Sequence, residues 1–430
     1  MRVAFVAMLV LALVSISVQA KANPLEAFGF GDRGVGLAGS MGASDDALSS
    51  AVYNPASAVY AAKPALGLGY TFATPDLTFN GSDAASADSH GMTGALVLPW
   101  QFHRDWKASL AGALYVPLNG LTEIRLRPAT EPQLVMWESR NHRIVSQGVL
   151  GFGYRRIMAF GIGLSVFGNI AGQGLDLNVN TLPGRTQANA NLQIDVPWRV
   201  APILGLIVQP LPQLRLGLRF MDEIALDANI YAESFVRVPG TSIEGDTIVR
   251  ARGLDFFVPR SVALAANVDL EDWSLSTQLS WHQWSRVSRV ASEVDLRIQL
   301  GIDIDAINFV APDPNWHDTW IARFGLEHHI PAGQGRLVNL RWGYAYIPSP
   351  VPNQTGVTSF ADADRHVFAA GAALTLPVDR LLVTLGASGQ AQVLAPRETT
   401  KDPQLGVGED FRLSGAVYVA SIFMRTTLPE

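Results

Sequence analysis

The sequence contains no cysteine among its 430 residues, and only 16% of the residues are charged. The absence of cysteine excludes disulfides, thiolate metal ligands and thiol catalysis. The charged fraction is well below the roughly 25% of an ordinary soluble domain, and 48% of the residues are hydrophobic. The net charge of −6 gives no electrostatic basis for binding nucleic acid, so no nucleic-acid partner is expected.

Long apolar runs are also missing beyond the start of the chain, where no segment approaches the 18 to 20 residues or so that a membrane-crossing helix needs. The start itself is different. Arg2 precedes an almost continuously apolar stretch from Val3 to Val18, and Ala20 and Ala22 offer small residues for cleavage. The sequence therefore predicts a signal peptide over residues 1–22 and an exported protein.

The next segment, residues 23–62, is rich in glycine, alanine and serine and has too little apolar periodicity for a strand or a self-supporting helix. Such a segment must lie against or inside a larger structure. We call it the N-terminal segment and predict that it plugs the lumen of a membrane barrel formed by residues 63–430.

Fourteen strand-like segments follow the N-terminal segment, separated by six short turns that alternate strictly with seven longer connections. Tight periplasmic turns, longer outer loops and an even number of strands are typical of outer-membrane barrels. The expected strands are 63–73, 90–102, 106–117, 142–154, 158–170, 189–209, 213–232, 249–269, 273–299, 319–330, 336–347, 365–376, 381–394 and 409–425.

Apolar and polar residues alternate along these segments, as the runs 214–221, 273–281 and 337–346 show. In the first run Leu216 and Leu218 share one face and Arg215 the other, which suits lipid outside and a polar lumen inside. A secreted soluble sandwich also alternates in this way. Arginines on the inward faces, strand length and loop alternation favour an all-β, fourteen-stranded antiparallel transmembrane barrel.

Three ordered blocks of residues carry a family resemblance. They are Gly34-x-Gly36-x-Ala38-Gly39 with Asp45-Asp46 and Asn54-Pro55-Ala56; Trp281-x-x-Trp284-Ser285; and Arg323-x-Gly325, Arg341-x-Gly343-Tyr344, Ser349-Pro350-Val351-Pro352 and Asp362-x-Asp364-Arg365-His366. Together they resemble the long-chain fatty-acid transporter (FadL) family of outer-membrane channels, which includes aromatic-hydrocarbon channels. The blocks span nearly all of the mature chain.

The resemblance implies passive uptake of a hydrophobic molecule, without catalysis or cofactor, from outer loops to an interior pocket and then sideways through a kinked third strand. In this chain that strand contains Gly112 and leads into Pro117 and Gly120, residue types that interrupt strands. Family members usually end on an aromatic residue that assists assembly. Here Phe423 is followed by a tail to Glu430.

Two sets of residues are candidates for function. The apolar loop cluster Leu134, Val135, Met136 and Trp137 is either an exposed docking surface for substrate or a loop packed on itself. In the N-terminal segment the polar residues Arg33, Asp45, Asp46 and Asn54, next to Pro55 and Ala56, face lumen arginines such as Arg215, Arg219, Arg323, Arg341 and Arg365. Carboxylate–arginine contacts would hold a plug reversibly, simple solvation of the lumen is the alternative, and Arg365 could meet a fatty carboxylate.

Other motifs give weaker signals. Gly29-x-Gly31-x-x-Gly34 follows no strand and is read as chance. The adjacent His328 and His329 lie on opposite faces of a strand, and Asp303, Asp305 and Asp313 fit a solvated loop better than a calcium site, so no metal is expected. A barrel lipid hydrolase and a soluble secreted binding protein remain as alternative functions.

The expected partners are a hydrophobic small molecule, outer-membrane lipid and lipopolysaccharide, and the barrel assembly machinery. The chain itself is expected to be a monomer located in the bacterial outer membrane.

Overall fold

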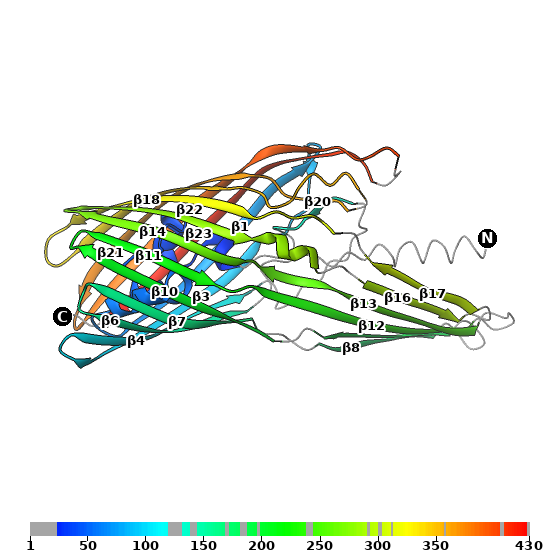
Figure 1. Cartoon of the computed structure of the whole chain (residues 1–430), viewed down its shortest axis with the longest axis horizontal. Coiled ribbons are helices and arrows are strands. Elements are labelled where there is room, and N and C mark those ends of the chain that lie inside the picture. Colours follow the sequence, from blue (N-terminus) through cyan, green and yellow to red (C-terminus); the bar gives the residue numbers. More distant parts are fainter. Residues whose placement is uncertain are drawn as a thin grey trace.

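Figure 1 shows the computed structural model of the chain as a long barrel with strands that extend beyond it at one end. The structure describes residues 24–118, 131–137, 144–167, 172–180, 187–195, 198–237, 244–289, 293–299, 303–310, 313–356, 358–404 and 408–427. The predicted signal peptide, residues 1–22, and Gly120 lie outside the described residues.

The wall of the barrel is a closed antiparallel sheet in which each strand pairs with its neighbours in chain order, and β1 closes the ring by pairing with both β3 and β23. The two-residue β2, Ser82–Asp83, adds a stub to β1. The fourteen wall strands are β1 Ala65–Phe79, β3 Ser89–His103, β4 Trp106–Pro117, β6 Val145–Tyr154, β7 Met158–Phe167, β10 Arg199–Leu211, β11 Leu214–Met221, β14 Arg260–Leu270, β15 Trp273–Gln283, β18 Thr319–Pro331, β19 Leu337–Ile347, β21 Arg365–Val378, β22 Leu381–Thr399 and β23 Phe411–Thr427.

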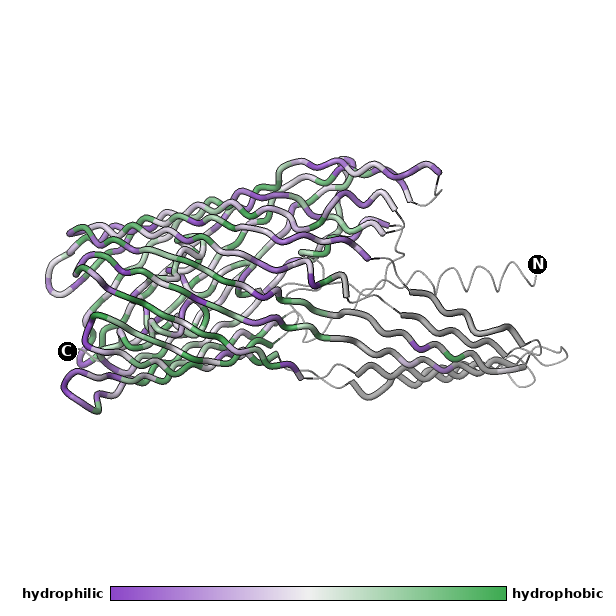
Figure 2. Tube along the Cα trace, in the orientation of Figure 1, coloured by the Kyte–Doolittle hydropathy of each residue, from purple (hydrophilic) through white to green (hydrophobic). Residues whose placement is uncertain are grey.

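The side chains of the wall alternate as the sequence predicts. Leu216 and Leu218 of β11 are exposed on the outer surface of the barrel, whereas Arg215 on the inner face of the same strand is buried. On β19 Trp342 is exposed and Arg341 is buried. Figure 2 shows the same alternation as bands of apolar and polar residues along the barrel strands. The predicted fourteen-stranded barrel is therefore confirmed, and closure leaves no unpaired edge toward lipid.

Three long connections differ from the prediction, because they carry strands of their own. The strands are β8 Gly172–Asn180, β9 Gln187–Asp195, β12 Ile224–Arg237, β13 Glu244–Val258, β16 Glu293–Gln299 and β17 Asp303–Val310. They form a second, six-stranded sheet, which we call the outer sheet. The predicted single strands 189–209, 213–232 and 249–269 each merged a wall strand with an outer-sheet strand, since only a few residues separate the two. The predicted strand 273–299 merged β15 with β16 across the 3-10 helix η3, Trp284–Arg289.

The N-terminal segment folds into short helical turns that lie inside the barrel in Figure 1, where they are drawn in blue. They are α2 Pro24–Phe28, α3 Gly31–Gly36, η1 Ala47–Ser49, α4 Ser50–Tyr53 and η2 Pro55–Tyr60. Most of their residues are buried against wall strands on several sides of the lumen. Among the described residues, no helix combines the length and the apolar character needed to cross a membrane.

Candidate functional site

Asn54, Pro55 and Ala56 join the N-terminal segment to the wall. The side-chain amide of Asn54 donates to the carbonyl oxygen of Gly42 over 2.7 Å, and its own oxygen accepts from the backbone N–H of Ala56 over 3.1 Å, which caps η2. The contact requires glycine opposite: a Cβ on Gly205 of β10 would come within 2.1 Å of the Asn54 oxygen.

A buried ion-pair cluster holds the other side of the N-terminal segment. Glu327 of β18 is 2% exposed and contacts two guanidinium groups, that of Arg33 over 2.7 Å and that of Arg341 over 2.6 Å. Arg341 also pairs with Asp32 of α3. Glu327 and Arg341 belong to the wall strands β18 and β19, and Asp32 and Arg33 belong to α3. The cluster therefore holds the N-terminal segment to the wall.

Asp45 and Asp46 make separate contacts with arginines. Asp45 lies 3.0 Å from Arg33 and 3.8 Å from Arg215 of β11. Desolvation in the lumen would raise the pKa of Asp45, but these two guanidinium groups outweigh it and lower the pKa to about 2. Asp46 lies 3.1 Å from Arg425 of β23. The acidic pair predicted to contact lumen arginines therefore does so at two places.

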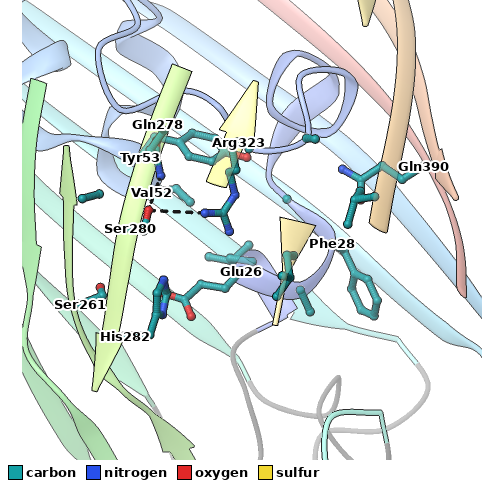
Figure 3. A pocket seen from close by; sticks show the side chains of 18 of the residues that line it. Glu26, Phe28, Val52, Tyr53, Ser261, Gln278, Ser280, His282, Arg323 and Gln390 are labelled. Atoms are coloured by element: carbon teal, nitrogen blue, oxygen red, sulfur yellow. Dashed lines mark hydrogen bonds between the residues drawn. The ribbon is translucent and has the colours of Figure 1, made fainter. Parts of the chain in front are cut away.

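Between the N-terminal segment and the wall lies a cavity of about 70 Å³, with a neighbouring one of about 40 Å³ that shares several of its lining residues. Figure 3 shows Glu26 and Tyr53 of the N-terminal segment around it, together with His282 and Arg323 of the wall. Both volumes are well below the roughly 300–1,000 Å³ of pockets that enclose drug-sized ligands. In this conformation the two cavities have room for water and small groups only.

Three arginines around these cavities, Arg219, Arg323 and Arg365, make no ion pair within the described part of the chain. Within the described ranges, the one hydrogen bond of the Arg323 side chain is its donation to the hydroxyl of Ser280, over 3.5 Å. The Nε atoms of Arg219 and Arg365 are buried and have no hydrogen-bond partner among the described residues. The site therefore combines three arginines and the carboxylates of Glu26 and Asp362 with buried N–H donors that an anion could satisfy.

An apolar cluster adjoins the smaller cavity, which its members Met136 and Trp284 line, and we call it the aromatic cluster. Its rings are Phe28, Trp137, Trp284, Trp316 and Phe360. The ring centroids of Phe28 and Trp137 lie 6.5 Å apart, and that of Trp316 lies 5.6 Å from Trp284 and 6.2 Å from Phe360. Two short parallel strands, β5 Gln133–Leu134 and β20 Phe360–Ala361, fix the loops that carry some of these rings.

The loop residues Leu134, Val135, Met136 and Trp137 belong to this cluster, and none is more than 4% exposed. The prediction of an exposed docking surface is therefore wrong, and the alternative of a packed loop describes the structure. Burial of these side chains removes their apolar area from water. Two of the residues still reach the site: Met136 lines the smaller cavity, and the guanidinium carbon of Arg365 lies 4.8 Å above the ring of Trp137.

The third wall strand shows no interruption. β4 pairs residue by residue with β3 and with β6 across Gly112, and Pro117 lies at its last position, opposite Gly91. A kink at Gly112 is therefore not present in the described backbone. Glycine weakens a strand but does not by itself break its ladder.

Several residues of the site were not predicted. Glu327, Asp32 and Arg425 carry much of the charge network. Glu327 and Arg425 are isolated charges in otherwise ordinary strands, and Asp32 lies beside Arg33 in the short helix α3. A signal was available for Glu327 and Arg425, because each occupies an inward position of an alternating strand. Phe423 also faces inward, with its ring 6.0 Å from that of Phe30.

A closed barrel with an apolar outer surface and a filled, charged lumen defines an outer-membrane channel protein. A family model described as "Outer membrane protein transport protein (OMPP1/FadL/TodX)" matches residues 143–427. The chain belongs to this family and is located in the bacterial outer membrane. A search of curated proteins finds no relative of the sequence.

Solved structures show the same fold at low identity. A Pseudomonas aeruginosa FadL homologue has a TM-score of 0.62 and 15% identity over 92% of this chain and 97% of its own. The Pseudomonas putida toluene transporter TodX has a TM-score of 0.55 and 16% identity over 96% and 99%. The Ralstonia pickettii toluene transporter TbuX has a TM-score of 0.52 and 14% identity over 94% and 99%. The family and these neighbours are transport channels, not enzymes.

Proposed function

We propose that the chain takes up hydrophobic molecules, long-chain fatty acids or hydrocarbons, by passive passage across the outer membrane. The observation that carries this proposal is the luminal cavity with arginines that make no ion pair among the described residues, placed directly below the aromatic cluster. A carboxylate head would satisfy these guanidinium groups, and an apolar tail would contact the rings. Related channels that carry toluene support the hydrocarbon alternative.

The proposed path begins at the outer end, passes Leu134 to Trp137, and reaches the arginines of the cavity, with Arg365 nearest to the aromatic cluster. The exit into the membrane is proposed at β4, between Gly112 and Pro117, and requires that its pairing open during transport. Because the cavity is smaller than any such substrate, the N-terminal segment or the aromatic cluster has to move as well. Residues 23–62 act as the plug in this proposal, and residues 1–22 as the cleaved signal.

Uptake measured in a bacterial strain that lacks its own fatty-acid transporter tests the proposal. Cells that produce the chain are expected to accumulate radiolabelled oleate and toluene faster than cells without it. Arg323→Met with Arg365→Met should lower oleate uptake at least fivefold and leave toluene uptake within twofold, since toluene has no carboxylate. Arg412→Met, which removes an exposed loop-side arginine, is the matched control. Equal uptake with and without the chain would reject the function.

A further inference from the structure

The outer face of the barrel wall carries an apolar groove that is separate from the luminal cavities. Its volume is about 600 Å³, compared with about 70 Å³ for the larger luminal cavity. The residues that line the groove belong to six neighbouring strands, in the order β19-β21-β22-β23-β1-β3. The spacings between these strands add up to a groove about 24 Å long.

The groove forms because small residues lie beside large ones on the outward face of the wall. The small residues Ala372, Gly386 and Ala387 leave its floor low. Its sides are large apolar side chains, 37 to 60% exposed: Leu68, Leu374, Leu385, Ile422 and Met424. None of the residues that line the groove in the described part of the wall is charged, and the hydroxyl of Tyr70 already contacts His90.

The groove lies in the half of the wall that faces the periplasm. Short turns of outer-membrane barrels are periplasmic, and Figure 1 shows the outer sheet at the opposite end of the barrel. Val338 and Leu385 follow Arg336 and Arg380 of these turns by about 7 and 17 Å along their strands. Because the strands tilt by about 35–45°, both residues lie within the roughly 15 Å of the periplasmic leaflet.

Cations gather on the periplasmic rim beneath the groove. Arg336 precedes β19, Arg380 precedes β22 and Lys63 precedes β1, and all three of these strands line the groove. None of the three cations makes an ion pair within the described ranges, and the neighbouring acid is Asp379. By contrast, the turn between β14 and β15 contributes the acidic pair 271–272. The positive charge is therefore placed under the groove and not spread evenly around the rim.

We propose that the groove binds an acyl chain of an anionic phospholipid of the periplasmic leaflet, with the phosphate at Arg336 and Arg380. The apolar lining selects a hydrocarbon chain, the depth selects the leaflet, and the cations select a negatively charged head group. A zwitterionic head group gains less from the same cations. The site lies outside the barrel, so the proposal does not depend on transport.

The position of the groove gives the bound lipid a role in stability. β1 and β23 are the first and last strands of the wall, and their pairing closes the ring. A lipid that extends from β19 to β3 covers this closing pair from outside. Since a ligand that binds only the folded state stabilises it by mass action, the anionic lipid should raise the temperature at which the barrel unfolds.

Native mass spectrometry of the purified full chain tests the selection of the head group. The parent should bind phosphatidylglycerol at least fivefold more tightly than phosphatidylethanolamine. Arg336→Gln/Arg380→Gln should lower phosphatidylglycerol binding at least fivefold, because the phosphate loses its two cations. Arg155→Gln/Arg156→Gln, in the turn between β6 and β7, is the matched control and should stay within twofold of the parent.

A second pair of variants tests the groove itself. Ala387→Trp fills it, whereas Ala322→Trp places the same ring on the exposed outward face of β18, away from the groove. Ala387→Trp should lower phosphatidylglycerol binding at least fivefold and remove the rise in unfolding temperature. Ala322→Trp should change neither. Heat-modified gel mobility checks that each barrel is folded and reports the unfolding temperature.

A fluorescence measurement covers the case in which Ala387→Trp fails to fold. Because the chain has no cysteine, Ala387→Cys and Ala322→Cys each give a single site for a fluorophore. In vesicles, phosphatidylglycerol with brominated acyl chains should quench the label at 387 at least twofold more than brominated phosphatidylethanolamine does. The two lipids should quench the label at 322 equally.

The results distinguish the possible occupants. If the parent binds the two phospholipids equally, or if either groove variant binds phosphatidylglycerol like the parent, the groove makes only ordinary lipid contacts and the proposal is overturned. If micromolar oleate displaces phosphatidylglycerol, the groove belongs to the transported substrate instead. If the purified parent is a dimer that Ala387→Trp dissociates, a second copy covers the groove, and this result also overturns the proposal.

Discussion

The barrel wall and the contents of its lumen are held by different interactions. The wall is a closed ladder of backbone hydrogen bonds, and β4 keeps its register with both neighbours from Lys107 to Tyr115. The N-terminal segment is held mainly by side chains, through the buried cluster around Glu327 and the contacts of Asp45, Asp46 and Asn54. A ladder opens only when several bonds break together, whereas single side-chain contacts exchange with water one at a time.

This difference indicates which part moves first. The N-terminal segment is held by a small number of separate side-chain contacts, so it can shift while the hydrogen-bonded wall stays closed. The small volume of the luminal cavities requires such a shift before any long substrate fits. An exit through β4 requires more, since the wall itself has to open there.

A disulfide that locks two wall strands together should give the largest change, a loss of oleate uptake. Ala95 of β3 and Ala113 of β4 lie directly opposite each other, and in a cysteine-free chain Ala95→Cys with Ala113→Cys can form one disulfide. If substrate leaves beside β4, oxidation should lower oleate uptake at least tenfold and reduction should restore it. Ala372→Cys with Ala387→Cys locks β21 to β22 as the control. Equal inhibition by both pairs, or by neither, would contradict an exit at β4.

Breaking the buried cluster is the next largest change. Glu327→Gln removes the charge that Arg33 and Arg341 share, and an uncompensated buried charge costs about 3 kcal/mol. The N-terminal segment should loosen while the wall persists, so bilayer conductance to small ions should rise and strand content by circular dichroism should stay unchanged. Glu398→Gln, at an exposed pair with Arg412, should change neither. Loss of strand content would show that the cluster supports the wall instead.

Replacing Asp45 and Asp46 with alanine should have a smaller effect of the same kind. Each carboxylate contacts an arginine of the wall, but Asn54 and Glu327 still hold the N-terminal segment. The barrel should fold and become moderately leakier to small solutes in a liposome-swelling assay. Permeability equal to that of the parent would mean that these two contacts do not restrain the segment.

The sequence alone predicts the strands of the barrel wall well. It predicts the outer sheet and the packing inside the lumen only in part. The predicted strand 106–117 has the same bounds as β4, because alternation and tight turns are local signals. The outer sheet was missed because its strands continue the same alternation, so nothing marks where β11 ends and β12 begins except Asp222 and Glu223. Burial of Leu134 to Trp137 depends on contacts with rings far along the chain, which no local pattern encodes.

Acid should weaken the ion pairs that hold the N-terminal segment before it weakens the wall. Of the four changes predicted, this one should raise the conductance least. The pKa of Asp45 is lowered to about 2 from an ordinary value of 3.8, so its contact stabilises the folded state above about pH 4 and is lost as the pH falls through about 2. Conductance of the parent should therefore rise between about pH 4 and pH 2, whereas Asp45→Asn should already show part of this rise at neutral pH and respond less to acid. A parent whose conductance and strand content change together would show that the wall and the N-terminal segment open as one unit.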